Sequence, residues 1–233
     1  MIAPLVAALD EWDRATFLAI NAHGHHPVLD VVMPVVTLFG LGHVQVFVLL
    51  AAAVLAAWRA GELGGPDGGI RALGRSLRSR RFWLAPVLVA MLISGLASNL
   101  IKEDERLRPW WFYSMEQLRG RFLDVEVRLV PGELPQRMRG FPSGHTTTSV
   151  AIACTLFLLR RRLSLRRRVV AGLWLGAGAV AFSRIYLATH WPLDIVGGIG
   201  FGVLGALASV LLLRRMIAAP AAAGAVAEAP GRA

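Results

Sequence analysis

The sequence predicts an all-α fold, a polytopic membrane helical bundle with five or six transmembrane helices and an N-terminal interfacial helix. Hydrophobic residues make up 55% of the 233 residues, charged residues only 17%, and the mean hydropathy is +0.56. Soluble domains carry roughly 25% charged residues, so this composition excludes an ordinary soluble domain. The apolar residues also form several long blocks separated by short arginine clusters, which is typical of membrane spans. The length fits one domain, residues 1–217.

The apolar blocks give the individual helices. Residues 1–26 carry Leu5, Leu9, Trp12, Phe17 and Ile20 at near-helical spacing among polar residues, which predicts a helix along the membrane surface. This segment lacks the basic start and continuous apolar core of a cleaved signal. Pro34 and a Gly-Leu-Gly break interrupt residues 27–58, which predicts a short buried or interfacial helix followed by a span. Four further blocks are candidate spans: residues 82–101, 146–159, 169–187 and 193–213.

The arginine clusters predict the orientation. Residues 59–81 hold six arginines against Glu62 and Asp67, and residues 160–168 hold six with no acid. By the positive-inside rule both segments face the cytoplasm, and so does the Arg214–Arg215 pair. The loop 103–141 and the turn 187–192 then lie on the outer side. Since the basic residues stand at block ends and not on one solvated face, topology explains the net charge of +10, and nucleic acid is not an expected partner.

Small residues and the tail complete the outline. Gly172, Gly176 and Gly178 form one small face and Gly198, Gly202 and Gly205 another, and both predict close helix packing in lipid. The single cysteine, Cys154, excludes a disulfide within the chain. Residues 218–233 are mostly Ala, Gly and Pro, which predicts a disordered tail.

Three polar clusters stand at the outer ends of apolar helices, where polar groups are costly unless they serve a function. The first runs from Lys102 to Arg108-Pro109. It is either a snorkelling lysine with an aromatic belt at residues 110–113, or a cationic clamp, because Arg and Lys are suited to phosphate oxygens.

The second cluster is Ser143-Gly144-His145, directly before an apolar block. Ser143 or Thr146 fits a helix cap. A helix N-terminus also presents unpaired N–H groups to an anion, and Gly144 allows a phosphate to approach the backbone. His145 is placed there to exchange a proton with a leaving group.

The third cluster contains Arg184, His190 and Asp194. Pro192 suits the first turn of a helix, so Asp194 stands one turn after His190 and can bond one imidazole nitrogen. Such a bond would fix the tautomer of a nucleophilic histidine. The other histidines (His23, His25, His26 and His43) are interpreted as ordinary interfacial residues, and no metal site is expected.

Together the clusters resemble the signature of the type 2 phosphatidic acid phosphatase superfamily, Lys-x6-Arg-Pro, Pro-Ser-Gly-His and Ser-Arg-x5-His-x3-Asp. The last two motifs match fully, at residues 142–145 and at residues 183–194. The first departs, because five residues, not six, separate Lys102 from Arg108. On a continuous helix this shift rotates Lys102 by about 100°. Either the backbone uncoils there or another residue, such as Arg106, takes the place of Lys102. The resemblance covers roughly residues 82–213.

The resemblance implies a phosphohistidine mechanism without metal or cofactor. His190, oriented by Asp194, would attack phosphorus, and His145 would protonate the leaving oxygen. The implied phosphate-binding residues are Arg108, Arg184, Lys102, Ser143 and Gly144.

The implied substrate is a lipid phosphate or diphosphate, with undecaprenyl diphosphate favoured. Phosphatidylglycerol phosphate, lipid A 1-phosphate and transfer of the phosphoryl group to a lipid acceptor remain alternatives. A non-enzymatic flippase or anion channel is a further one. The implied location is a bacterial plasma membrane, with the site facing the periplasm or cell exterior, and no oligomeric state is indicated.

Overall fold

The computed structural model describes residues 2–63, 69–102, 106–129 and 136–218. In these ranges all regular secondary structure is helical, which confirms the predicted all-α bundle. Four helices are long and apolar enough to cross a membrane: α3 (Gly42–Arg59), α5 (Arg81–Leu100), α8 (Arg167–Tyr186) and α9 (Pro192–Leu212). Two shorter apolar helices are α2 (Pro27–Leu38) and α7 (Gly144–Leu159). The others are α1 (Ile2–Asn21), α4 (Ile70–Ser79), α6 (Pro109–Leu118) and α10 (Arg214–Ala218).

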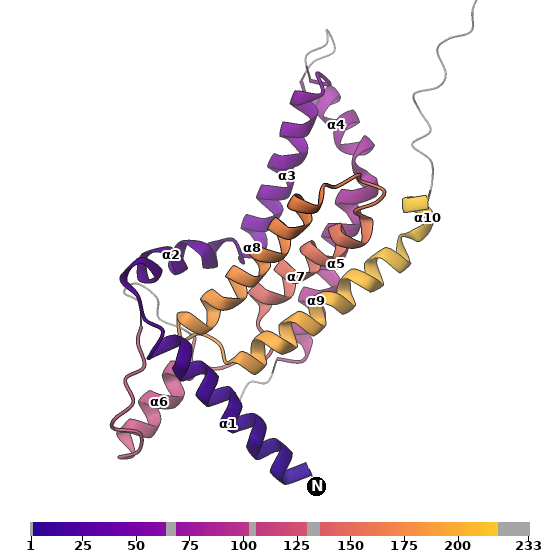
Figure 1. Cartoon of the computed structure of the whole chain (residues 1–233). Helices are drawn as coiled ribbons and strands as arrows, with labels where there is room; N and C mark the ends of the chain where they lie inside the picture. The colour runs from indigo at the N-terminus through magenta and orange to yellow at the C-terminus, as the bar shows by residue number, and fades with distance from the viewer. Residues whose placement is uncertain (1, 64–68, 103–105, 130–135, 219–233) are drawn as a thin grey trace, which may run out of the picture.

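Helix α7 lies at the centre of the bundle, packed against α5, α8 and α9 (Figure 1). Glycines of α9 make this contact possible. A Cβ on Gly202 would lie 2.6 Å from the carbonyl oxygen of Thr147, and a Cβ on Gly198 would lie 2.8 Å from that of Ser143. A Cβ on Gly205 would meet the Ser94 side chain of α5 at 2.6 Å. The predicted small face of α9 is therefore confirmed.

The prediction of close helix packing through the glycines of α8 is wrong. A Cβ on Gly172, Gly176 or Gly178 would meet no atom of the described chain within 4 Å. All three are exposed, because α8 turns this face away from the bundle.

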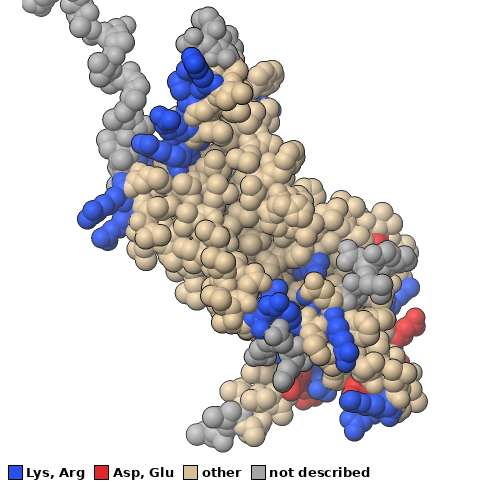
Figure 2. Space-filling view, turned by 180° about the vertical axis from the view of Figure 1, so that it is seen from behind, with Lys and Arg blue, Asp and Glu red and all other residues tan. Residues whose placement is uncertain are grey.

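The two ends of the bundle differ in charge. The connection between α3 and α5, which contains α4, lies at the same end as the α7–α8 connection and α10, whereas α1, α2 and α6 lie at the other end (Figure 1). Figure 2 shows Lys and Arg alone at one end, mixed acidic and basic residues at the other, and a largely uncharged band between them. The arginine-rich segments thus gather at one end, as the positive-inside interpretation requires.

Helix α1 forms as predicted, and it packs on the bundle through a face that the sequence did not single out. Leu5, Leu9 and Trp12 are 61%, 42% and 46% exposed, whereas Asp13 and Phe17 are buried. The buried stripe continues one turn later at Asn21, whose Nδ2 donates to the carbonyl oxygen of Tyr186 at 2.7 Å. The apolar residues Leu5, Leu9 and Trp12 thus stay exposed, and a partly polar stripe packs on the bundle.

The aromatic segment after Arg108 forms helix α6 and does not act only as an aromatic belt. Tyr113 is 2% exposed and stacks on Phe17 with ring centroids 6.0 Å apart. Phe112 contacts Trp191 edge-on at 5.7 Å. Helices α1 and α6 therefore build an aromatic cluster against the turn that joins α8 to α9. The predicted disordered tail lies, apart from Ala218, outside the described residues.

Candidate active site

The turn between α8 and α9 places His190. Its backbone N–H and that of Thr189 both donate to the carbonyl oxygen of Arg184, each at 3.1 Å. Ala188 is fully buried with φ of 54°, a left-handed conformation that costs a non-glycine residue energy and is common at functional sites. Helix α9 then starts at Pro192, as predicted. The turn is thereby held in one conformation from both sides.

His190 and Asp194 form the expected pair. His190 Nδ1 lies 3.3 Å from Asp194 Oδ2, which also accepts the Trp191 N–H at 2.9 Å. A proton held on Nδ1 by the carboxylate leaves Nε2 unprotonated, the form that can act as a nucleophile. Burial lowers the pKa of His190 to about 4; the bond to Asp194 opposes this shift, and the charges of Arg184 and Arg108 add to it. The imidazole is therefore neutral at neutral pH.

The second cluster meets the third through the backbone. The Ser143 N–H donates to the carbonyl oxygen of Asp194 at 3.0 Å. Ser143 occupies the N-cap position of α7, as expected, but its hydroxyl accepts from the Thr146 hydroxyl at 3.1 Å and caps no helix N–H. The first turn of α7 thus starts beside the start of α9, which brings the two histidine-bearing segments together.

His145 lies close to His190. The charged groups that act on His145 electrostatically include His190, Arg184, Arg108 and Lys102. On its other side His145 packs against Gly40, where a Cβ would lie 2.5 Å from His145 Cδ2. The three predicted clusters therefore lie close together at one end of the bundle.

Two buried guanidinium groups lie near the two histidines. Arg108 is 6% exposed; its Nε donates to the carbonyl oxygen of Met138 at 3.2 Å and one terminal nitrogen to Gln136 Oε1 at 3.4 Å. Arg184 is 7% exposed and donates to the Thr37 hydroxyl at 2.5 Å. These bonds from Arg108 go to neutral oxygens, so its charge stays available to an anion. Burial lowers the pKa of Arg108, and Asp194 opposes that shift.

Lys102 lies near the same cations. Helix α5 ends at Leu100, so the 100° rotation of a continuous helix does not apply to Lys102. Burial lowers its pKa, and so do the charges of Arg108, Arg139 and Arg184. Arg106 instead pairs with Asp194 and Asp13. Because the helix ends before Lys102, the shortened motif does not turn Lys102 away, and Lys102 stays close to the buried arginines.

Several residues around the site were not identified from the sequence. They are Asp13, Thr37, Gly40, Arg139 and Gly140, and for Arg106 only a clamp role was considered. Gly140 lies where a Cβ would come within 3.2 Å of Asp194 Oδ2. The available signals were the Gly-Leu-Gly break at residues 40–42 and the Arg-Gly pair just before the second motif. In the described ranges no cluster of three or more His, Cys, Asp or Glu side chains is arranged to hold a metal ion.

The fold and the site define a helical membrane protein with a histidine–aspartate pair, and with a second histidine and clustered cations close to that pair. A sequence model of the PAP2 superfamily matches residues 83–217. Because this match covers more than half of the chain, the protein belongs to the PAP2 superfamily.

Two proteins with similar sequences come from bacteria. The lipid A 1-phosphatase of Rhizobium johnstonii is 28% identical over 135 residues, which are 57% of this chain and 49% of that protein. A protein of Escherichia coli K12 named "Putative undecaprenyl-diphosphatase YbjG" is 34% identical over 76 residues, 33% of this chain and 36% of that protein. The matches thus span about half or less of the length of these relatives.

Two solved structures share the fold. LpxE of Aquifex aeolicus has a TM-score of 0.60 at 24% identity, covering 84% of this chain and 93% of that one. The PAP2-type phosphatidylglycerolphosphate phosphatase of Bacillus subtilis has a TM-score of 0.58 at 19% identity, covering 90% and 88%. At these identities the likeness concerns the fold alone.

Proposed function

We propose that this PAP2 protein is a membrane lipid phosphatase that works through a phosphohistidine at His190. The observation that carries the proposal is the neutral, buried His190, whose Nδ1 lies 3.3 Å from Asp194, with His145 and two buried arginines close by. A pocket that only binds an anion needs positive charge but no imidazole oriented by a carboxylate.

In the first step His190 Nε2 attacks phosphorus. A P–N bond forms, the P–O bond to the leaving group breaks, and His145 gives its proton to the departing oxygen. In the second step water attacks the phosphohistidine, His145 takes a proton from that water, and the P–N bond breaks. Inorganic phosphate leaves and His190 returns to its starting form.

The cations stabilise the charge that develops on the phosphoryl oxygens. Arg108 and Arg184 are buried, so solvent screens their charge less than on a surface. We assign Lys102 and the backbone N–H groups of Ser143 and Gly144 to the same task. The N-terminus of α7 adds a partial positive charge that favours the anion.

The substrate is proposed to be a lipid. The His190 site lies at one end of an apolar bundle, so a lipid can present its phosphate there while its chains stay in hydrocarbon. Undecaprenyl diphosphate is the substrate named for the E. coli relative, and lipid A 1-phosphate is favoured by the longer match to the Rhizobium enzyme. The proposed location is the bacterial plasma membrane, with the site on the side opposite the arginine-rich end.

Trapping the intermediate tests the proposal. Purified protein mixed with ³²P-labelled undecaprenyl diphosphate or lipid A 1-phosphate and quenched in base should carry label on wild-type protein and none on His190→Ala. Turnover by His190→Ala at the wild-type rate contradicts the nucleophile assignment. Release of inorganic phosphate without a lipid acceptor distinguishes hydrolysis from transfer. Retention of activity in EDTA would support the metal-free route, and loss that added divalent metal restores would refute it.

A further inference from the structure

We infer that Arg106 and Asp13 are positioning residues that hold the His190–Asp194 pair through the Asp194 oxygen that does not face the imidazole. This inference rests on the proposed role of His190 as the nucleophile. It links the N-terminal helix α1, which lies outside the three sequence motifs, to the reaction.

The Asp194 carboxylate is fully buried and has defined partners on both oxygens. Arg106 Nε donates to Oδ1 at 2.8 Å, whereas Oδ2 accepts the Trp191 N–H at 2.9 Å and faces His190 Nδ1. A buried carboxylate that lost its cation would keep an uncompensated charge and a free oxygen. The Arg106 bond therefore fixes which oxygen faces the imidazole.

Asp13 holds Arg106 in turn. A terminal nitrogen of Arg106 donates to Asp13 Oδ2 at 2.9 Å, and the Leu193 N–H of α9 donates to Asp13 Oδ1 at 2.8 Å. Asp13 is 4% exposed and stands one helical turn before Phe17, whose ring packs on Trp191 at 5.2 Å. Helix α1 thus contacts the start of α9 through the Asp13 carboxylate and the Phe17 ring.

The charges alternate along this chain of contacts, from Asp13 through Arg106 and Asp194 to His190. A cation on the carboxylate opposes protonation of the imidazole, and an anion on that cation weakens the effect. Removing Arg106 should therefore make His190 easier to protonate, and neutralising Asp13 should make it harder. Residues with only a structural role would not shift the pH profile in opposite directions.

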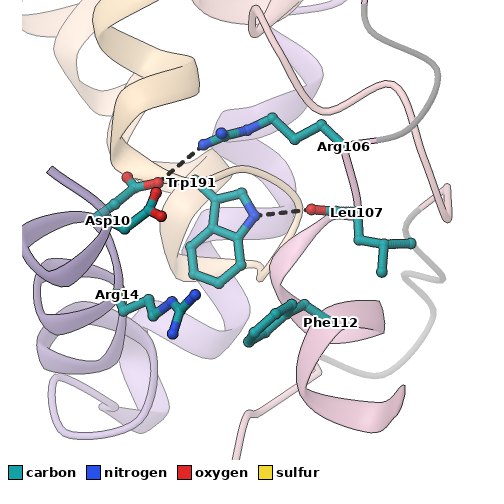
Figure 3. Close-up of a pocket in the computed structure, with 7 residues that line it drawn as sticks. Asp10, Arg14, Arg106, Leu107, Phe112 and Trp191 are labelled. Carbon is teal, nitrogen blue, oxygen red and sulfur yellow. Dashed lines mark hydrogen bonds and ion pairs between the residues drawn. The ribbon is translucent and has the colours of Figure 1, made fainter. Parts of the chain in front are cut away.

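A cavity of about 260 Å³ opens beside Arg106 (Figure 3). Arg106, Asp13, Arg14, Phe112 and Trp191 belong to its lining. Arg14 lies over the Phe112 ring at 5.1 Å. The cavity gives a small planar cation a route to the two carboxylates if the Arg106 side chain is removed.

Chemical rescue is the decisive experiment. Arg106→Ala should lower kcat roughly 10- to 100-fold, as loss of a group that orients another active-site group does elsewhere. Added guanidinium should restore much of this loss, whereas methylammonium should not, because only the planar fork bridges both carboxylates. Arg14→Ala, which removes a guanidinium from the same cavity but not from Asp194, should keep its kcat and gain nothing from guanidinium.

The pH profile of kcat/KM gives a second readout. In the Arg106→Ala profile the acid limb should move to higher pH, and in the profile of the isosteric Asp13→Asn it should move to lower pH. Each shift should be on the order of one pH unit. Folded Arg106→Ala protein with no guanidinium response and an unmoved limb overturns the inference. If wild-type protein forms no phosphohistidine, the proposed function itself is contradicted, and this inference with it. If wild type and Arg106→Ala label equally fast, only this inference fails.

Discussion

Replacement of Gly40 by alanine should displace His145 and lower activity, although the substitution removes no polar group. Gly40 lies between α2 and α3 and packs against the first turn of α7. A Cβ there would lie 2.5 Å from His145 Cδ2, 2.8 Å from His145 Cβ and 2.7 Å from Val180 Cγ1. Rotation of the imidazole relieves only the first of these contacts. The second involves an atom fixed to the backbone, so α7 or the α2–α3 connection must move.

The size of the effect follows from these distances. Carbon atoms pack at about 3.5–4.0 Å, so the new methyl group must displace His145 by about 1 Å. Such a displacement of a catalytic group can lower the rate roughly 10²-fold. Overpacking at a buried position should also cost about 1–3 kcal/mol of folding free energy.

The assay is phosphate release by purified Gly40→Ala, together with its thermal unfolding midpoint. The matched control is Gly42→Ala, because a Cβ on Gly42 meets no atom of the described chain within 4 Å and the residue opens α3. This control should keep wild-type activity. Adding Val180→Ala to Gly40→Ala should recover stability but not kcat. Wild-type kcat in Gly40→Ala would refute the assignment of His145 to the reaction.

Three further predictions concern pH, Lys102 and orientation. The pKa of His190 is about 4 in the folded protein and about 6.5 in the unfolded chain, so the unfolded chain binds more protons between these two pH values. The free energy of unfolding should therefore fall by roughly 3 kcal/mol as the pH drops from 6.5 to 4. Thermal scans of His190→Gln should show a shallower fall, and parallel curves would contradict this. Lys102→Ala should lower kcat on the order of 10²-fold; a change under about threefold would place Lys102 outside the site. Leu118→Cys, at an 80% exposed position of α6, should react with an impermeant maleimide on intact cells, whereas the 90% exposed Ile70→Cys should react only after permeabilisation; the reverse pattern would invert the topology.

Local spacing was enough to predict the centre of the site. Pro192 fixes where α9 starts, and the interval from His190 to Asp194 is one helical turn, so their pairing depends only on residues that are neighbours in sequence. The same holds for Ser143 at the start of α7. Convergence of the clusters required only that their helix ends lie on one side of the membrane, which the arginine clusters indicated.

Contacts between distant segments were not predictable in this way. Asp13 and Arg106 are 93 positions apart, and no local rule relates them. In the sequence Arg106 is one more cation in a cluster that also contains Lys102 and Arg108. Its different role is decided by where two carboxylates lie in space. Likewise, Gly40 gave a signal for a break in the helix but none for the side chain that fills the space beside it.

The apolar residues of α1 do not mark the side that packs on the bundle, for a reason specific to membranes. Periodic apolar residues identify the face that leaves water, and next to a bilayer that face can meet lipid in place of protein. In the apolar helices the same holds, since Val31 of α2 and Phe47 of α3 are each 72% exposed. Polar residues mark the protein-facing side instead: Thr37 and Gln45 are buried in these helices, where Thr37 binds Arg184 and Gln45 Nε2 donates to Ser149 Oγ of α7 at 2.8 Å. A polar side chain in lipid is costly unless it has a partner, so its position indicates where a neighbouring helix must lie. In α1, which also carries the exposed polar residues Asp10 and Glu11, polarity alone does not select a face. The structure shows that the buried ones are Asp13 and Asn21, on the side that reaches the His190 turn.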